Sequence, residues 1–383
     1  MALEGSLKNK ITINNDPWEP YRDIEQHGQL TLSNVEFTTT NLCNMRCSHC
    51  AVGYTLQTRD PDPLPMSLIL KRLDEIPTLR TISITGGEPM FSKKSIRDVV
   101  KPLLQYAKRR GIYVQMNSNL TLPLDRYLDI AEYIDVMHIS HNWGTIETFT
   151  EVGFGAMEKK PPLQARTRLF EQMLSNAQTL SEQGMFVSAE TMLNKQTAPY
   201  LEKIHKEVVQ TMKCQRHEIH PMYPADFASQ LEVLSLTEMK NAIHQLLDFR
   251  DPNVWMLFGT LPIFPCLDSE EDTVLRQRLQ QAPNVSMRND PDGRSRLNVN
   301  VFTGNVIVTD FGDETGTLAN IQTDTLTSVF DKWLASSLSN SINCHCPHVS
   351  CLGPNVLVKN MYYPNEDFKA LEKQMHQQYL QNR

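Results

Sequence analysis

The segment Cys43-Asn-Met-Arg-Cys47-Ser-His-Cys50 places three cysteines within eight residues. It follows Asn34-Val-Glu-Phe-Thr-Thr-Thr40, whose β-branched and aromatic residues predict a strand. A disulfide uses two cysteines and a closed zinc site uses four protein ligands, so a group of three indicates a metal site with one open position. The alternative for this segment alone is a zinc site that borrows a distant fourth ligand, for which His49 is a poorly placed candidate.

The composition limits the classes of protein to which this chain can belong. The chain has 383 residues, 40% of them hydrophobic and 21% charged, which predicts a packed core and two domains, or one large domain with an appendage. The net charge of −7, without a long run of Lys and Arg, argues against a nucleic-acid binder. The first residues carry no apolar segment typical of a signal peptide, and no stretch resembles a membrane span. We therefore expect a cytoplasmic protein without a membrane partner, in which clustered cysteines bind metal.

Strand-like and helix-like patterns alternate from residue 34 to about residue 225, which predicts an α/β fold with a parallel sheet covered by helices. Six such units would curl into a partial or open barrel, because parallel crossovers are right-handed. The expected strands are 34–40, 78–85, 112–116, 135–140, 185–191 and 217–220, and the expected helices are 93–110, 124–134, 165–183 and 198–212.

The unusual polar residues follow the ends of these strands. The first cysteine group follows the first strand, Gly86-Gly87-Glu88-Pro89 follows the second, Asn119 the third and Ser140 the fourth. Because ligands bind at the carboxyl ends of parallel strands, we expect these residues on one face. The two glycines would allow a ligand to approach the backbone closely, and Glu88 would accept from a cation.

The alternation ends after Pro224, which predicts a domain boundary near 225–235. Ser235-Leu-Thr-Glu238 is a capping box that opens a helix, and Thr303-Gly304-Asn305 predicts the turn of a β-hairpin. A short helix at 325–333, a second cysteine group, Cys344-His-Cys346-Pro-His-Val-Ser-Cys351, and a terminal helix at 365–380 follow. The expected organisation is an N-terminal extension (1–33), a core (34–228) and a smaller C-terminal α+β domain (229–383).

Cys43, Cys47 and Cys50, followed by Gly-Gly-Glu-Pro after the second strand, resemble the radical S-adenosylmethionine (radical SAM) superfamily over residues 34–225. The resemblance implies a partial (β/α)6 radical SAM barrel and an enzyme. The three cysteines would hold a [4Fe–4S] cluster whose open iron binds S-adenosylmethionine. One electron, from a flavodoxin- or ferredoxin-type reductant, would cleave this cofactor, and the resulting 5′-deoxyadenosyl radical would take hydrogen from a substrate.

The same resemblance implies roles for residues of the cofactor site. His49, directly before Cys50, holds the place of an aromatic residue that contacts adenine. Gly86, Gly87 and Glu88 match the segment that receives the methionine amino group. Asn119 and Ser140 lie where the family often contacts ribose or carboxylate, although a solvated residue at a strand end is the alternative for Asn119.

The C-terminal region is similar to the SPASM or twitch extensions of radical SAM maturases, which carry auxiliary [4Fe–4S] clusters. The chain has Thr309 and Asp310 where such domains usually have a cysteine, so the match favours one auxiliary cluster. As a whole, the chain resembles most the radical SAM proteins with a C-terminal CxCx4C motif. We expect Cys266 to complete a four-ligand site with the thiols of the second group, Cys344, Cys346 and Cys351. A structural zinc site is the alternative, with His345 and His348 as rival ligands.

The expected function is modification of a peptide or protein side chain. The alternatives are a radical SAM reaction on a small metabolite, and a non-catalytic iron–sulfur or zinc protein that transfers electrons. No general base is identified. Glu190, His217 and His220 lie near strand ends, where an ordinary strand or core position is the alternative for each.

Overall fold

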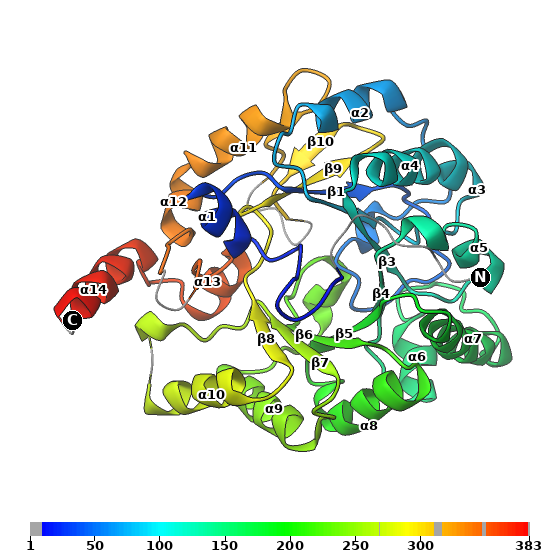
Figure 1. The fold of residues 1–383 in the computed structure, drawn as a ribbon. Coiled ribbons are helices and arrows are strands. Elements are labelled where there is room, and N and C mark those ends of the chain that lie inside the picture. The colour runs from blue at the N-terminus through cyan, green and yellow to red at the C-terminus, as the bar shows by residue number, and fades with distance from the viewer. Residues whose placement is uncertain (1–9, 268, 310–315, 347–349, 382–383) are drawn as a thin grey trace.

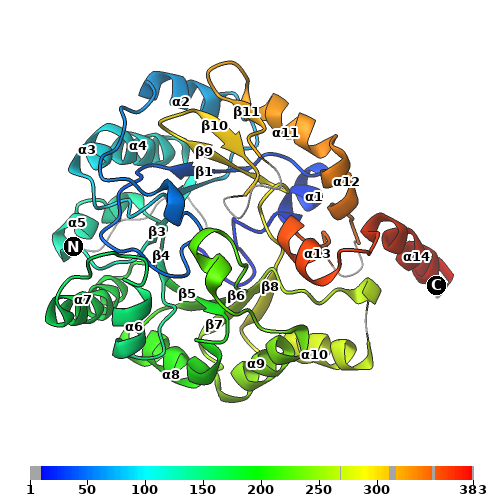
Figure 2. The same ribbon diagram turned by 180° about the vertical axis from the view of Figure 1, so that it is seen from behind.

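The computed structural model describes residues 10–267, 269–309, 316–346 and 350–381. Parallel strands curve into a ring, and helices cover its outside (Figures 1 and 2). The strands are β1 (Asn34–Thr38), β2 (Thr81–Thr85), β3 (Tyr113–Ser118), β4 (Val136–Ser140), β5 (Val187–Leu193), β6 (Arg216–Pro221), β7 (Trp255–Gly259), β8 (Val285–Arg288), β9 (Arg296–Asn300), β10 (Asn305–Ile307) and β11 (Ala319–Asn320).

These strands form one sheet in the order β11-β10-β9-β1-β2-β3-β4-β5-β6-β7-β8. The strands from β1 to β8 pair in parallel, and β1 also pairs in parallel with β9, so that Val35 lies between Ile82 and Leu297. The hairpin predicted around Gly304 is present as the antiparallel pair β9 and β10. Residues far apart in sequence therefore share one sheet.

The prediction that the βα alternation stops after Pro224 is wrong. Helix α9 (Leu236–Phe249) leads into β7, and α10 (Glu270–Gln281) leads into β8, so two more parallel strands extend the sheet past residue 228. The run Trp255–Gly259 is buried at every position, so it lacks the period-two pattern that marks a half-exposed strand. At four residues, β8 is too short to show a period.

The remaining helices lie mainly on the outside of the sheet, where their apolar faces form the core. The predicted helices at 93–110, 165–183 and 325–333 are present, and the one expected at 124–134 ends early, at Leu128. Their bounds are α1 (Tyr21–His27), α2 (Met66–Asp74), α3 (Lys93–Ser95), α4 (Lys101–Arg110), α5 (Leu124–Leu128), α6 (Ile146–Val152), α7 (Leu163–Glu182), α8 (Leu201–Lys206), α11 (Leu326–Leu334), α12 (Ser337–Ile342), α13 (Val356–Tyr362) and α14 (Phe368–Gln381).

The N-terminal segment 10–33 crosses the ring on the side seen in Figure 1. Trp18 is buried and donates from Nε1 to Ser83 Oγ on β2 (3.2 Å), and its ring packs edge-on against Tyr113 at the start of β3. Arg80 pairs with the buried Asp23 at 2.8 Å. The segment thus seals the end of the ring at which the strands begin, and leaves the opposite end for the strand-end loops.

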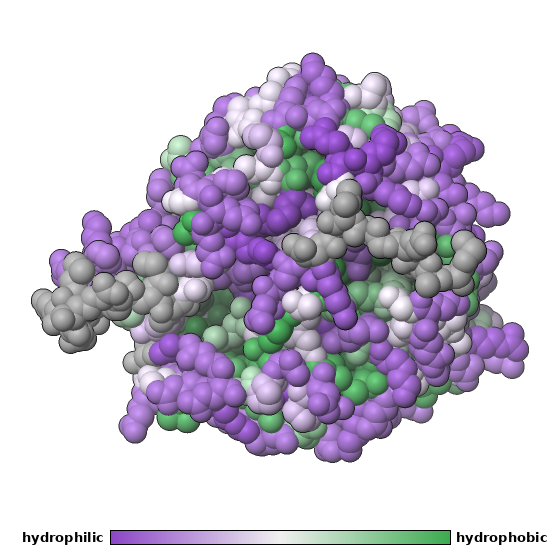
Figure 3. Space-filling model, viewed as in Figure 1, coloured by the Kyte–Doolittle hydropathy of each residue, from purple (hydrophilic) through white to green (hydrophobic). Residues whose placement is uncertain are grey.

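Hydrophilic residues cover most of the face seen in Figure 3. In the described part of the chain, no helix combines the length and the apolar composition needed to cross a bilayer.

Candidate functional site

The first cysteine loop follows β1 and is held by the segment after α6. Arg46 N–H donates to the Gly153 carbonyl (3.2 Å) and Ser48 N–H to the Val152 carbonyl (2.8 Å). A Cβ atom on Gly155 would overlap Ser48 Oγ. Backbone bonds on both sides therefore fix the half-buried thiols Cys43, Cys47 and Cys50. This support could not be predicted from the sequence, because glycines at 153 and 155 are also typical of ordinary turns.

The loop after β2 packs against the same cysteine loop. Gly87 N–H donates to the Thr40 carbonyl (2.8 Å), and Glu88 N–H donates to the Leu42 carbonyl (2.7 Å). A Cβ atom on Gly87 would lie closer than 3.0 Å to the Leu42 carbonyl, and Gly86, at φ +137°, meets Thr40 in the same way. The glycine pair therefore permits two backbone loops to meet. Close approach of a ligand to these glycines stays a prediction.

Glu88 is fully buried, and its expected role as an acceptor for a cation stays a prediction. Its carboxylate accepts from Ser118 Oγ (2.9 Å), Asn119 N (2.8 Å) and Met90 N (3.2 Å). Burial raises its pKa to about 7, although these hydrogen bonds oppose the shift. The side chain thus ties the end of β3 to the loop after β2 and presents no carboxylate to solvent.

Asn119 contacts the cysteine loop directly. Its Nδ2 donates to Asn44 Oδ1 (3.0 Å) and lies 3.8 Å from Cys43 Sγ, while its Oδ1 accepts from Thr121 Oγ1 (2.7 Å). Met45 N–H also points at Cys43 Sγ, at 3.4 Å. The structure therefore places Asn119 beside a metal-ligand candidate rather than in a solvated turn.

His49 belongs to the cysteine loop and packs against residues that follow β4, the strand that ends at Ser140. His49 is buried, its Nε2 lies 3.4 Å from Asn142 Nδ2, and its ring centroid is 5.1 Å from that of Trp143. Burial lowers the pKa of His49 to about 4, so the imidazole is neutral near pH 7. Ser140, the last residue of β4, is half-buried and pairs in register with Glu190 on β5.

The loop after β6 closes over the end of the cysteine loop. Phe227 N–H donates to the Cys50 carbonyl (3.2 Å), and both carboxylate oxygens of Asp226 accept from Tyr54 N–H (3.1 and 2.9 Å). The ring of Phe227 lies over Gly53, where a Cβ atom would overlap it. Sequence reasoning missed this contact, because it joins residues about 170 positions apart.

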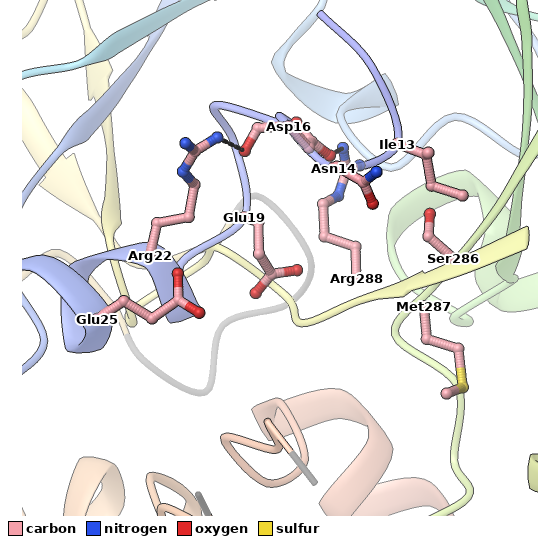
Figure 4. Close-up of a pocket in the computed structure, with 9 residues that line it drawn as sticks. All are labelled: Ile13, Asn14, Asp16, Glu19, Arg22, Glu25, Ser286, Met287 and Arg288. Carbon is pink, nitrogen blue, oxygen red and sulfur yellow. Dashed lines mark hydrogen bonds and ion pairs between the residues drawn. The ribbon is translucent and has the colours of Figure 1, made fainter. Parts of the chain in front are cut away.

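Charged side chains fill the inside of the ring below these loops. His138 Nε2 is 2.7 Å from Glu190, and His220 Nε2 is 2.7 Å from Glu218. Arg288 on β8 pairs with Glu218 and, at 3.3 Å, with Asp16 of the N-terminal segment. Figure 4 shows Arg288 reaching Asp16 beside a cavity of about 210 Å³ that Glu19 also lines. Glu190 and His220 thus belong to one buried network, whereas His217 lies behind the sheet against His205 (2.9 Å).

The second cysteine group lies in the C-terminal region beside Cys266. Cys346 and Cys351 form a two-residue bridge through their backbones (2.9 and 3.2 Å), and Gly353 N–H donates to Cys351 Sγ (3.3 Å). Cys266 packs in the same cluster as Cys344 and Cys351, whereas Cys214 is buried in the main core. His345 faces Tyr21, with Nε2 3.4 Å from the hydroxyl, and His348 lies outside the described residues.

The chemistry of both groups fits thiolate-bound metal. Burial raises the pKa of Cys43 to about 12 and that of Cys50 to about 11, so without a cation these thiols keep their protons. In the described part of the chain, no three His, Cys, Asp or Glu side chains converge closely enough for a single metal ion. A cubane cluster does not require such convergence, because each thiolate binds a different iron.

Comparison with known proteins agrees with this arrangement. Residues 37–208 match the Radical SAM superfamily, and residues 222–373 match a YfkB-like domain. The protein YfkA of Bacillus subtilis (strain 168) is 62% identical over 358 residues, which is 94% of this chain and 96% of the relative.

The chain belongs to the radical SAM superfamily. It is therefore an enzyme of the radical SAM class, and that class uses a [4Fe–4S] cluster and S-adenosylmethionine. The predicted α/β barrel with a C-terminal extension is confirmed.

Solved radical SAM structures share the fold at low identity. Streptococcus suis SuiB bound to S-adenosylmethionine superimposes with a TM-score of 0.60 and 15% identity, over 88% of this chain and 76% of SuiB. The enzyme anSMEcpe with bound AdoMet gives 0.59 and 14%, over 91% of this chain and 98% of that one. Both likenesses extend beyond the barrel strands into the C-terminal region.

Proposed function

We propose that Cys43, Cys47 and Cys50 hold the [4Fe–4S] cluster of this radical SAM enzyme and that its substrate is a peptide or protein side chain. When bound, the cluster and S-adenosylmethionine supply a 5′-deoxyadenosyl radical that takes hydrogen from the substrate. The observation that carries the proposal is the cysteine loop itself. It lies at the carboxyl ends of the strands, braced by Gly86–Glu88 on one side and by the segment after α6 on the other.

The surrounding residues have distinct tasks in this proposal. Asn119 and the Met45 amide direct N–H groups at Cys43 Sγ, which stabilises negative charge on that sulfur. Glu88 fixes the end of β3 and so positions Asn119. The neutral imidazole of His49, beside Trp143, offers a flat surface for adenine. Ser140, at the end of β4, and the backbone of Gly86 and Gly87 are the further groups that we expect to contact the cofactor.

The preference for a peptide substrate is supported by the fold. SuiB has been solved with its precursor peptide SuiA, and anSMEcpe with the peptides Cp18Cys and Kp18Cys. The superposition covers 86% of this chain for the SuiB complex and 92% for the two anSMEcpe complexes. The likeness therefore includes the region after the barrel. A small metabolite and a non-catalytic electron carrier are the alternatives that experiments must separate.

We further propose that Cys266, Cys344, Cys346 and Cys351 bind an auxiliary [4Fe–4S] cluster. Cys266, Cys344 and Cys351 lie in one cluster of packed residues, and Cys346 pairs with Cys351 through two backbone hydrogen bonds. A flavodoxin- or ferredoxin-type protein is the expected source of electrons for the first cluster.

The first experiment measures 5′-deoxyadenosine after anaerobic reconstitution with iron and sulfide, followed by S-adenosylmethionine and dithionite. Wild-type protein should release it, and the Cys43→Ala, Cys47→Ala and Cys50→Ala variants should release none. Cys214→Ala, which removes a buried thiol of the core, is the matched control and should keep the activity. A cluster-loaded wild type without cleavage would instead support an electron carrier, and a cleaving Cys50→Ala variant would refute the ligand assignment.

The second experiment identifies the substrate class. Cells grown on deuterated amino acids supply an extract, which is separated by size into a peptide and protein fraction and a metabolite fraction. Deuterium should enter 5′-deoxyadenosine from the first fraction. Transfer only from the metabolite fraction would overturn the peptide proposal and leave the radical SAM assignment intact.

A further inference from the structure

Arg294 is a buried cation whose partners are all backbone carbonyls. The side chain is fully buried, and its Nε and Nη2 donate to the carbonyls of Leu352 (both 3.3 Å), Gly353 (3.2 Å) and Pro354. Its Nη1 has no hydrogen-bond partner in the described part of the chain. Taking a cation out of water without an ion-pair partner in contact is costly, so a source of compensation is required.

The nearby carboxylates Asp290 and Asp292 form no ion pair with Arg294 among the described residues. Asp290 accepts from Asn355 Nδ2 (2.5 Å) and Asp292 N (3.0 Å), and Asp292 forms an ion pair with Arg296 at 2.7 Å. Among the described residues, Arg294 has no ion pair with a carboxylate within 4.0 Å. Burial disfavours the charged guanidinium and lowers its pKa, whereas negative charge at Asp290, Cys344 and Cys351 favours it.

The carbonyls that Arg294 holds belong to the peptide that touches the second cysteine group. Gly353 N–H donates to Cys351 Sγ at 3.3 Å, and Gly353 lies so close to Cys344 that a Cβ atom would be 2.6 Å from its Sγ. The guanidinium is therefore one peptide away from two of the four thiols. Four thiolates around a [4Fe–4S] core or a zinc ion leave a net negative charge, which would add to that of Asp290 in compensating Arg294.

We propose that Arg294 is the buried counter-charge of the four-thiolate site and that it raises the reduction potential of the metal bound there. The inference rests on the auxiliary site proposed above. A cation close to the site stabilises the reduced form, which is the more negative one, and the burial of Arg294 keeps the interaction strong.

The test uses the full chain carrying Cys43→Ala, Cys47→Ala and Cys50→Ala, so that only the second site titrates. Arg294→Gln and Arg294→Lys are compared with this parent after anaerobic reconstitution, by iron and sulfide analysis and by a redox titration followed by electron paramagnetic resonance. Arg294→Gln should lower the midpoint potential by about 59 mV or more, a tenfold change for a one-electron couple, and Arg294→Lys should stay near the parent. Loss of iron from Arg294→Gln alone would also support the proposal.

The two variants distinguish the effect of the charge from that of the hydrogen bonds. Both lose the guanidinium geometry that binds the three carbonyls, but only Arg294→Lys keeps the positive charge. Equal loss of iron from both variants would show that Arg294 only shapes the loop, and this would overturn the proposal. An unchanged potential in a fully loaded Arg294→Gln variant would overturn it as well. A parent protein that binds no iron would refute the auxiliary cluster itself, and with it this inference.

Discussion

Gly87 lies where the loop after β2 comes closest to the loop that carries the cysteines. Its N–H donates to the Thr40 carbonyl at 2.8 Å, and the space that a side chain would need is taken by the Leu42 carbonyl. Leu42 directly precedes Cys43, so any displacement there moves a proposed cluster ligand. At the residue scale, Gly87 therefore allows the loop after β2 to pack directly on the backbone of the cysteine loop, in addition to its expected place in the cofactor site.

Gly87→Ala should therefore remove most of the iron bound by Cys43, Cys47 and Cys50, because the added methyl group pushes the loop away from β2. Iron analysis of the reconstituted variant checks this expectation. Gly111→Ala is the control. An added Cβ atom there would meet no other atom within 4 Å, so the variant tests the backbone strain of a φ of +67° without a steric clash. If Gly87→Ala keeps its iron and binds S-adenosylmethionine more weakly, close approach of the cofactor is what requires this glycine.

At the scale of elements, β6 separates two polar environments. Alternate side chains of β6 point into the ring, namely Arg216, Glu218 and His220. There Glu218 pairs with Arg288. His217 points to α8, and its Nδ1 is 2.9 Å from His205 Nδ1. Asp251 N–H donates to His205 Nε2 (2.9 Å), so in the neutral pair His205 Nδ1 is the donor and His217 Nδ1 the acceptor. This chain of bonds needs two neutral imidazoles.

Stability should fall as the pH drops from about 6.5 towards 4, because burial lowers the pKa of His205 to about 4 and that of His217 well below its usual value. The unfolded chain then binds more protons than the folded one, and full stability is present only above pH 6.5. For His205 alone, a difference of about 2.5 pKa units corresponds to at most about 3 kcal/mol.

The measurement is the thermal midpoint at pH 7 and pH 5 for the wild type and for the double variant His205→Gln, His217→Gln. The wild type should lose more stability between the two pH values than the double variant does. His27→Gln, at an exposed position, is the control and should follow the wild type. Equal pH dependence in wild type and double variant would show that another group carries the effect.

For the whole molecule, the N-terminal segment and the C-terminal region complete a barrel that the six expected strands leave open. Trp18 fills the end of the ring at which the strands begin. Asp16 reaches Arg288 on β8 (Figure 4). Asn289, which follows β8, donates from Nδ2 to Glu19 (2.9 Å) and accepts from Leu352 N–H (3.1 Å). One residue thereby connects the N-terminal segment to the peptide next to Cys351.

Trp18→Ala should lower the free energy of unfolding by about 3–5 kcal/mol, because it leaves a large cavity at the closed end of the ring. Trp18→Phe keeps most of the volume and loses the hydrogen bond to Ser83, so its cost should be clearly smaller. Denaturant titration of both variants checks the order. A Trp18→Ala variant as stable as wild type would mean that the segment does not contribute to the fold.

Cys266→Ala should halve the iron of the reconstituted chain, from roughly eight to roughly four atoms, while 5′-deoxyadenosine production without substrate persists. The reason is that Cys266 packs beside Cys344 and Cys351, far from the first cluster in sequence. Iron and zinc analysis distinguishes the outcomes. A wild type with about four irons and one zinc would replace the auxiliary cluster by a zinc site, and unchanged metal content in Cys266→Ala would remove Cys266 from either.

The sequence by itself determined the chemistry and the local order of the fold. Three cysteines after a strand, followed one βα unit later by two glycines and a glutamate, led to the radical SAM superfamily, and the comparisons confirm it. The roles of the individual site residues and the boundary near residue 228 remain predictions. These features could be read because strands, helices and short motifs depend on neighbours close in sequence.

Only the tertiary structure decided which distant segments meet. It placed β9 beside β1, Cys266 beside Cys344, Phe227 on the Cys50 carbonyl and Arg294 behind the second cysteine group. It also turned Glu88 away from solvent and showed that Leu42 needs the space beside Gly87. None of these contacts leaves a local pattern, because each arises when separate elements pack together and their buried polar groups must find partners.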